Sequence, residues 1–132
     1  MSLNNKETPL LHRFWKETGG TLIEEFYAAK RSSTHSERRI DGVIIKNGEH
    51  IIKPQSEVSI KNKDIIAVEV KTGRLGRYLM GQTLFAKYLL ESLSPHSIES
   101  VAVCQRDDDV LRPLLESFDG VRVVIYENQT KK

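Results

Sequence analysis

The chain has 132 residues, of which 39% are hydrophobic and 29% charged, with a net charge of +2. This size and composition are typical of one globular domain with its own core, and we predict a single domain over residues 1–132. No apolar run approaches the roughly 20 residues of a membrane span. The N-terminus lacks a signal-peptide pattern, so we expect a cytoplasmic protein. The single cysteine, Cys104, excludes an internal disulfide and a multi-cysteine metal cluster.

The pattern of apolar residues and turn signals predicts three helices and five main strands. In chain order these are a helix over 9–18, strands over 21–29, 40–45 and 65–71, a helix over 75–93, a strand over 98–105, a helix over 110–118 and a strand over 121–126. Residues 1–8 are polar, and we expect them to be frayed. Residues 49–63 could form one or two irregular strands around Pro54.

This order predicts the fold class. The first three strands suggest an antiparallel meander, and the alternation of helix and strand that follows suggests a parallel crossover unit. We therefore predict an α/β domain with a mixed central sheet flanked by helices. Asn47-Gly48 is a strong turn signal after the second strand.

Two carboxylates are predicted to lie on neighbouring strands. Asp41 is near the start of the second strand, and Glu69 is near the end of the third. Burying a charge is costly unless it is paired or holds a metal. Two carboxylates form the hard oxygen site that suits Mg²⁺ or Mn²⁺. The alternative for Asp41 is an ordinary turn residue at a strand start.

Lys71 lies two residues after Glu69, so both side chains are expected on one face of the strand. An ammonium beside a metal site can position the attacking water and stabilise charge on a phosphate. Phosphodiester hydrolysis requires both effects. The alternative is a structural salt bridge between Glu69 and Lys71.

One amide interrupts the apolar stripe of the predicted 75–93 helix. The stripe consists of Leu75, Leu79, Gln82, Ala86, Leu89 and Leu93. A buried amide needs hydrogen-bond partners. Because the stripe should pack against the sheet that carries Glu69, Gln82 is a candidate for the same site. The alternative is a core glutamine bonded to the backbone.

A supporting glutamate is expected from the N-terminal part of the chain. Alternation places Glu24 and Glu25 on opposite faces of the first strand, so one of them must lie on an apolar face. Glu17, near the end of the first helix, is a further candidate. We favour Glu25, because its face is the less continuous apolar one, but the pattern leaves all three open.

Basic residues gather in four short groups. These are Lys30-Arg31, Arg38-Arg39, Lys61 with Lys63, and Arg74 with Arg77. One such group alone is typical of a solvated surface. Because the groups lie near the candidate site segments, we predict that Arg39, Arg74 and Arg77 contact nucleic acid. The four histidines show no ligand spacing and are interpreted as surface or loop residues.

Together these residues resemble the PD-(D/E)XK nuclease superfamily. The matching segments are Ile40-Asp41-Gly42-Val43-Ile44, Val68-Glu69-Val70-Lys71 and Gln82. The resemblance covers the chain from Thr8 to Gln105 and implies a restriction-endonuclease-like αβββαβ core, extended by the last helix and strand. In the helicase-linked exonuclease branch a tyrosine follows the glutamine by four, but that position here is Ala86.

The resemblance also implies roles for individual residues. Asp41 and Glu69 would bind one or two divalent ions, Lys71 would assist the attacking water, and Gln82 would match the supporting glutamine of some branches. An N-terminal glutamate is an additional ligand or organiser in several branches, and among the three candidates we favour Glu25.

We therefore predict a Mg²⁺- or Mn²⁺-dependent deoxyribonuclease. DNA is the expected partner, with a second copy of the chain or another protein supplying specificity, and no membrane partner is expected. The main alternative is a non-catalytic module of the same fold that binds nucleic acid or protein. A third reading is a small structural subunit of a larger assembly.

Overall fold

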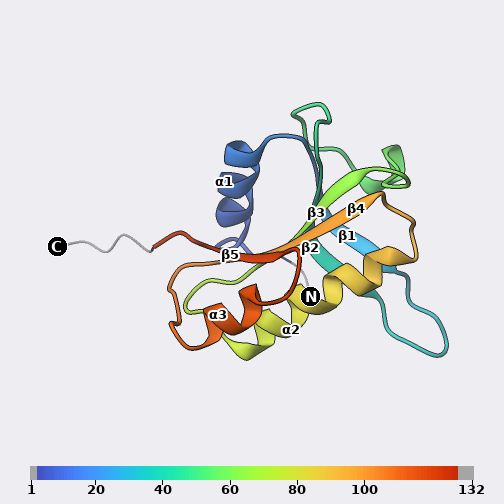
Figure 1. The fold of residues 1–132 in the computed structure, drawn as a ribbon. Helices are drawn as coiled ribbons and strands as arrows, with labels where there is room; N and C mark the ends of the chain where they lie inside the picture. The colour runs from blue at the N-terminus through green and yellow to red at the C-terminus, as the bar shows by residue number, and fades with distance from the viewer. Residues whose placement is uncertain (1–2, 128–132) are drawn as a thin grey trace.

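The computed structural model describes residues 3–127 as a five-stranded sheet with helices on both faces (Figure 1). The elements are α1 (Thr8–Thr18), β1 (Thr21–Ala29), β2 (Arg38–Ile45), the 3₁₀ turn η1 (Gln55–Glu57), β3 (Asp64–Val70), α2 (Arg77–Glu91), β4 (Ser97–Cys104), α3 (Leu111–Glu116) and β5 (Val121–Ile125). No helix within this part of the chain is long and apolar enough to cross a membrane.

The sheet is mixed, as predicted, and its strands lie in chain order from β1 to β5. β1, β2 and β3 form an antiparallel meander, while β4 and β5 are added in parallel to β3. A parallel neighbour needs a crossover, and α2 and α3 supply the two crossovers. The α/β class predicted from the sequence is confirmed.

The core lies on both faces of the sheet. α1 covers one face with Leu11, Phe14 and Trp15, which pack in a cluster with Ile44 and Val68. α2 and α3 cover the opposite face, as Figure 1 shows. Because both faces are covered, the central strands β2 and β3 are almost continuously buried.

The segment after β2 protects the outer edge of β1 and forms no regular strand in the described chain. The N–H of Leu22 donates to the Ile51 carbonyl, and the N–H of Lys53 donates to the Leu22 carbonyl. Farther along, the Gln55 amide bonds both backbone groups of Tyr27. The irregular strands considered for residues 49–63 are therefore replaced by an isolated bridge and the turn η1.

The start of the chain differs most from the prediction. Residues 4–7 are not frayed, because Asn4 and Glu7 form a capping box. The Glu7 N–H donates to Asn4 Oδ1 at 2.8 Å, and the Asn4 N–H donates to Glu7 Oε1 at 3.3 Å. The Asn4-x-x-Glu7 spacing is the sequence signal for this cap, and the expected fraying is wrong for residues 4–7. As a result, Glu7 is buried at the start of α1.

Two adjacent glycines between α1 and β1 provide a matched stability test. Both have φ +83°, but a Cβ on Gly20 would lie 2.4 Å from the Ile45 carbonyl oxygen, whereas a Cβ on Gly19 meets nothing within 4 Å. The Gly19 backbone, at φ +83° and ψ −169°, lies in a region that is essentially restricted to glycine, so we predict that Gly19→Ala lowers the free energy of unfolding by about 1–3 kcal/mol from backbone strain alone.

Gly20→Ala should lower the free energy of unfolding by more than Gly19→Ala, about 3 kcal/mol or more, because a clash with the Ile45 carbonyl is added to the strain of a positive φ. Urea denaturation of both variants measures the difference. Equal losses would show that the close approach of this turn to β2 does not constrain the fold.

Candidate active site

The candidate site lies where β2 and β3 separate, a region that we call the strand fork and that contains Asp41, Glu69 and Val70. The last pair between β2 and β3 joins Gly42 to Val68. Beyond it β2 pairs only with β1, whereas β3 stays paired with β4. The Asp41 side chain bridges the opening, since its Oδ2 accepts a hydrogen bond from the Val70 N–H at 2.9 Å.

The fork brings two buried carboxyl groups together, as the sequence predicted. Asp41 is 8% exposed and Glu69 3% exposed. Burial raises the pKa of Asp41 to about 6. Burial, with the neighbouring Asp41 charge, raises the pKa of Glu69 to about 9. The metal-free pair therefore retains a proton at neutral pH.

One oxygen of this pair is unsatisfied. Glu69 Oε1 is buried without a hydrogen-bond partner. The salt bridge considered between Glu69 and Lys71 is not among the ion pairs of residues 3–127, although the sequence spacing allowed it. A buried acceptor without a partner lowers the stability of the fold, and a bound ligand or a proton would satisfy it.

Glu7, which is not among the three glutamates predicted from the sequence, is the N-terminal glutamate whose charge acts on Asp41. It is buried, and its negative charge contributes to the raised pKa of Asp41. Even so, the described residues contain no group of three or more His, Cys, Asp or Glu side chains arranged to hold a metal ion.

The three glutamates that the sequence offered are engaged elsewhere. Glu17 accepts a hydrogen bond from the Tyr126 hydroxyl, and Glu24 pairs with His12 of α1. Glu25, the favoured candidate, accepts the Leu3 N–H and forms an ion pair with Arg39 at 2.9 Å.

Glu25 nevertheless lies beside the fork. Its neighbours Glu24 and Phe26 pair with Gly42 and Ile40, so Glu25 is opposite Asp41 in the register. Its backbone has φ +51°, a left-handed conformation that is uncommon for a residue with a side chain. Ile23 and Phe26, three apart, pack in one cluster, so the alternation of faces is interrupted here.

Lys71 and Gln82 occupy different positions relative to the pair. Lys71 follows the end of β3, where its N–H donates to the Val103 carbonyl and its side chain is exposed. Gln82 is half-buried and lines an open pocket together with Glu69. The predicted helix stripe is correct at Leu75, Leu79 and Ala86, which are buried, but Gln82, Leu89 and Leu93 lie outside the buried face. The face of α2 that is buried consists of Leu79, Thr83, Ala86 and Leu90.

This pocket, which we call the α2 pocket, has a volume of about 470 Å³. It is lined by Arg38, Arg39, Glu69, Arg77, Tyr78, Gly81, Gln82, Phe85 and Leu89. The part of β2 beyond the fork supplies two arginines, β3 supplies the buried carboxyl, and one side of α2 supplies the rest. Glu69 is the one acidic residue in this lining, so the surroundings of the pocket favour an anionic ligand.

The three arginines predicted to contact nucleic acid lie in two places. Arg39 and Arg77 line the α2 pocket, and ion pairs to Glu25 and Glu37 position the Arg39 guanidinium. Arg74 lies in the loop after β3 and donates to the Asp107 carbonyl at 2.8 Å. Arg38, which the prediction omitted although it belongs to the Arg38-Arg39 pair, also lines the pocket.

No family model, curated protein or solved structure matches this chain. The interpretation of the site therefore depends on its own geometry.

The buried pair predicts a pH dependence of stability in metal-free protein. Because the folded state raises the pKa of Glu69 from 4.5 to about 9, it holds a proton that the unfolded chain releases. This contribution to stability is complete below the unfolded pKa and is lost as the pH rises through the folded pKa.

We therefore expect Glu69→Gln, which carries no ionisable proton, to lose less stability than the wild type between about pH 5 and pH 9. Urea denaturation in the presence of a chelator measures this. The exposed Glu57→Gln variant is the control and should follow the wild type. Parallel curves for Glu69→Gln and the wild type would contradict the raised pKa.

Proposed function

We propose that this protein is a metal-dependent nuclease that hydrolyses phosphodiester bonds, with DNA as the expected substrate. The observation that carries the proposal is the buried Asp41–Glu69 pair, in which Glu69 has an unsatisfied oxygen and lines a pocket together with three arginines. Phosphodiester cleavage needs a cation at the nucleophile and positive groups around the phosphate. This arrangement can provide both.

The donor set fits a hard divalent cation. Mg²⁺ is commonly bound through one or two carboxylates, with water and substrate phosphate as the remaining ligands. Asp41 and Glu69 would hold it, and Glu69 Oε1 would gain the partner that it lacks. A bound ion would supply an activated water and neutralise developing charge.

The element order supports the same proposal at the level of the fold. A helix, three antiparallel strands, a helix and a parallel strand occur in the order that a restriction-endonuclease-like core would have, and α3 and β5 extend the sheet. The two carboxylates lie on the second and third strands, where that resemblance would place them.

The other residues act on the substrate in this proposal. Lys71, at the end of β3, orients the attacking water and stabilises negative charge on the phosphate. Gln82, which lines the α2 pocket together with Glu69, orients the site, and Arg39 and Arg77 contact the phosphate backbone. Selectivity for a sequence would come from a second copy of the chain or from another protein.

The first test is cleavage. Purified protein with Mg²⁺ or Mn²⁺ is incubated with supercoiled, linear duplex and single-stranded DNA. We expect Asp41→Asn, Glu69→Gln and Lys71→Ala to reduce cleavage by about 100-fold or more, because each removes a group that acts on the transition state. Lys61→Ala, which removes an exposed lysine outside the site, should cleave at the wild-type rate. Cleavage that survives in all three site variants would remove the proposal.

A second candidate function is a non-catalytic nucleic-acid-binding module. Two observations favour it: the described residues lack a group of three metal-ligating side chains, and the Lys71 side chain is exposed rather than part of the pocket lining. In that case the arginines of the pocket would bind phosphate without turnover.

Metal binding separates the two functions. If Asp41 and Glu69 hold Mg²⁺ or Mn²⁺, millimolar metal should raise the melting temperature at neutral or mildly alkaline pH, because a ligand that binds only the folded state stabilises it. Asp41→Asn and Glu69→Gln should abolish this increase, and Glu57→Gln should retain it. An equal metal response in wild type and site variants would favour the binding module.

A further inference from the structure

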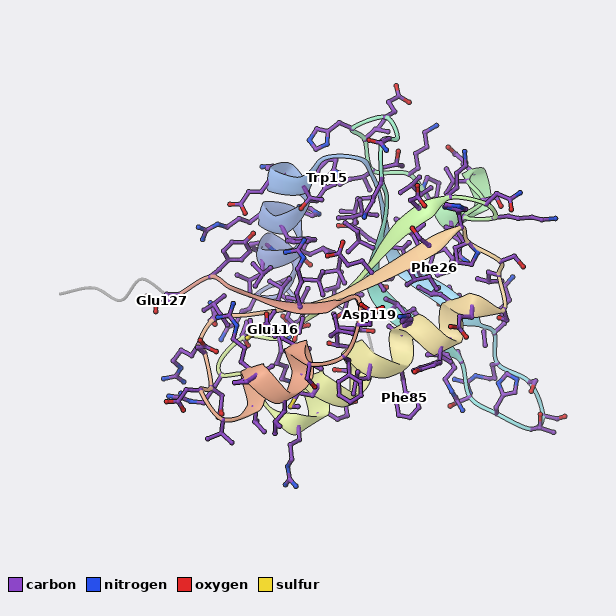
Figure 2. All side chains as sticks on the ribbon, viewed as in Figure 1. Trp15, Phe26, Phe85, Glu116, Asp119 and Glu127 are labelled. Carbon is purple, nitrogen blue, oxygen red and sulfur yellow. The ribbon has the colours of Figure 1, made fainter. Side chains whose placement is uncertain are left out.

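The α2 pocket carries a feature that phosphodiester chemistry does not explain. Two large aromatic side chains on its helical wall are open to solvent, with Tyr78 62% and Phe85 67% exposed. Figure 2 shows Phe85 on the side of α2 that points away from the sheet. The two residues are seven apart, two helical turns, so they lie on the same side of α2 about 10 Å from one another along its axis.

Gly81 lies between these two aromatic residues, and the fold does not require a glycine there. A Cβ at this position would meet nothing within 4 Å, and its φ is not positive. A glycine inside a helix costs about 1 kcal/mol relative to alanine. Its effect is to leave the helix backbone open between Tyr78 and Phe85, where a flat group can approach closely.

The charge of the pocket indicates which kind of ligand would bring a flat group to this part of the helix. Arg38 and Arg77 line the pocket, and neither is in an ion pair with another residue of the described chain. Arg38 instead donates to the Ser36 hydroxyl at 2.6 Å, a neutral partner that leaves its charge uncompensated. Positive charge beside exposed aromatic faces is typical of a site for phosphates joined to bases.

We propose that the α2 pocket binds a single-stranded segment of nucleic acid, with unpaired bases stacked on Tyr78 and Phe85 and phosphates on Arg38 and Arg77. In a duplex the faces of the bases are covered by their neighbours, so rings on a helix surface can stack only on bases that are unpaired. The inference deepens the nuclease proposal, because Glu69 lines the same pocket and the bound strand would lie beside it.

The test is a binding measurement without turnover. Fluorescence anisotropy in the presence of a chelator compares a short labelled single-stranded oligonucleotide with the same sequence as a duplex. We expect tighter binding of the single strand. Because stacking on one ring contributes about 1–3 kcal/mol per base, Tyr78→Ala and Phe85→Ala should each weaken it by about 5- to 150-fold.

The chain supplies a matched control on the same helix. Tyr88 is 62% exposed, as Tyr78 is, but does not line the pocket. Tyr88→Ala should therefore bind the single strand as the wild type does. Gly81→Leu should weaken binding by filling the gap, while its melting temperature stays at or above that of the wild type, since Leu is the better helix former.

Equal affinity for duplex and single strand would overturn the inference, as would equal effects of Tyr88→Ala and Phe85→Ala. These outcomes differ from a failure of the proposed function. If the single strand binds through Tyr78 and Phe85 but no DNA is cleaved with Mg²⁺ or Mn²⁺, the nuclease proposal fails and the binding site stands. If duplex DNA is cleaved through Asp41 and Glu69 without preferential single-strand binding, the single-strand inference fails and the nuclease proposal stands.

Discussion

The hydrogen bond from the Val70 N–H to the Asp41 carboxylate is the interaction on which the candidate site depends. Where β2 turns away from β3, the Val70 N–H of β3 would otherwise be buried without a hydrogen-bond partner, which is costly in a sheet. A side chain from β2 takes the place of its backbone. The strands can therefore separate without leaving the Val70 N–H unpaired, and the separation leaves a buried polar space in an otherwise apolar sheet. Asp41 is fixed there by a structural need, and Glu69 is brought against it by the register of β3.

The packing of α1 holds this fork in place. Gly42 follows Asp41, and a Cβ at that position would lie 2.8 Å from Leu11 Cδ1 of α1. The missing side chain thus lets α1 approach the sheet closely just beside the fork. It also brings the start of α1 near the fork, which is why the charge of Glu7 is felt at Asp41. On the other side, the loop after β3 is fixed to the end of β4 by the Gly73 N–H, which donates to Gln105 Oε1. The carboxyl pair is therefore bounded on one side by the packing of α1 and on the other by a hydrogen-bonded loop.

Much of the fold, and the convergence of the two carboxyls, could be predicted because both depend on local patterns. β1 has the predicted bounds, and the other strands differ by two residues or fewer at each end. The predictions that were wrong concern features that tertiary contacts determine. The rotation of α2 about its axis is set by the packing of Thr83 and Leu90 in the core. Gln82 therefore lies on the pocket wall and not on the buried face, where it was predicted. Glu7 was missed because an isolated capping box is a weak signal in a polar terminus. Glu25 was favoured from strand alternation, which the left-handed backbone at that residue interrupts.

The separation of the strands explains the pocket as well as the carboxyl pair. Once β2 leaves β3, it carries Arg38 and Arg39 with it on the β1 side, while α2 stays packed across β3 and β4. The space between these two parts of the structure is the α2 pocket, and Glu69 is the one residue of β3 that lines it. A regular β2–β3 ladder would bring these arginines back against β3, and no space would remain. The buried acids, the arginines and the exposed face of α2 are thus consequences of one irregularity in the sheet, and a ligand that needs all three finds them at a single place.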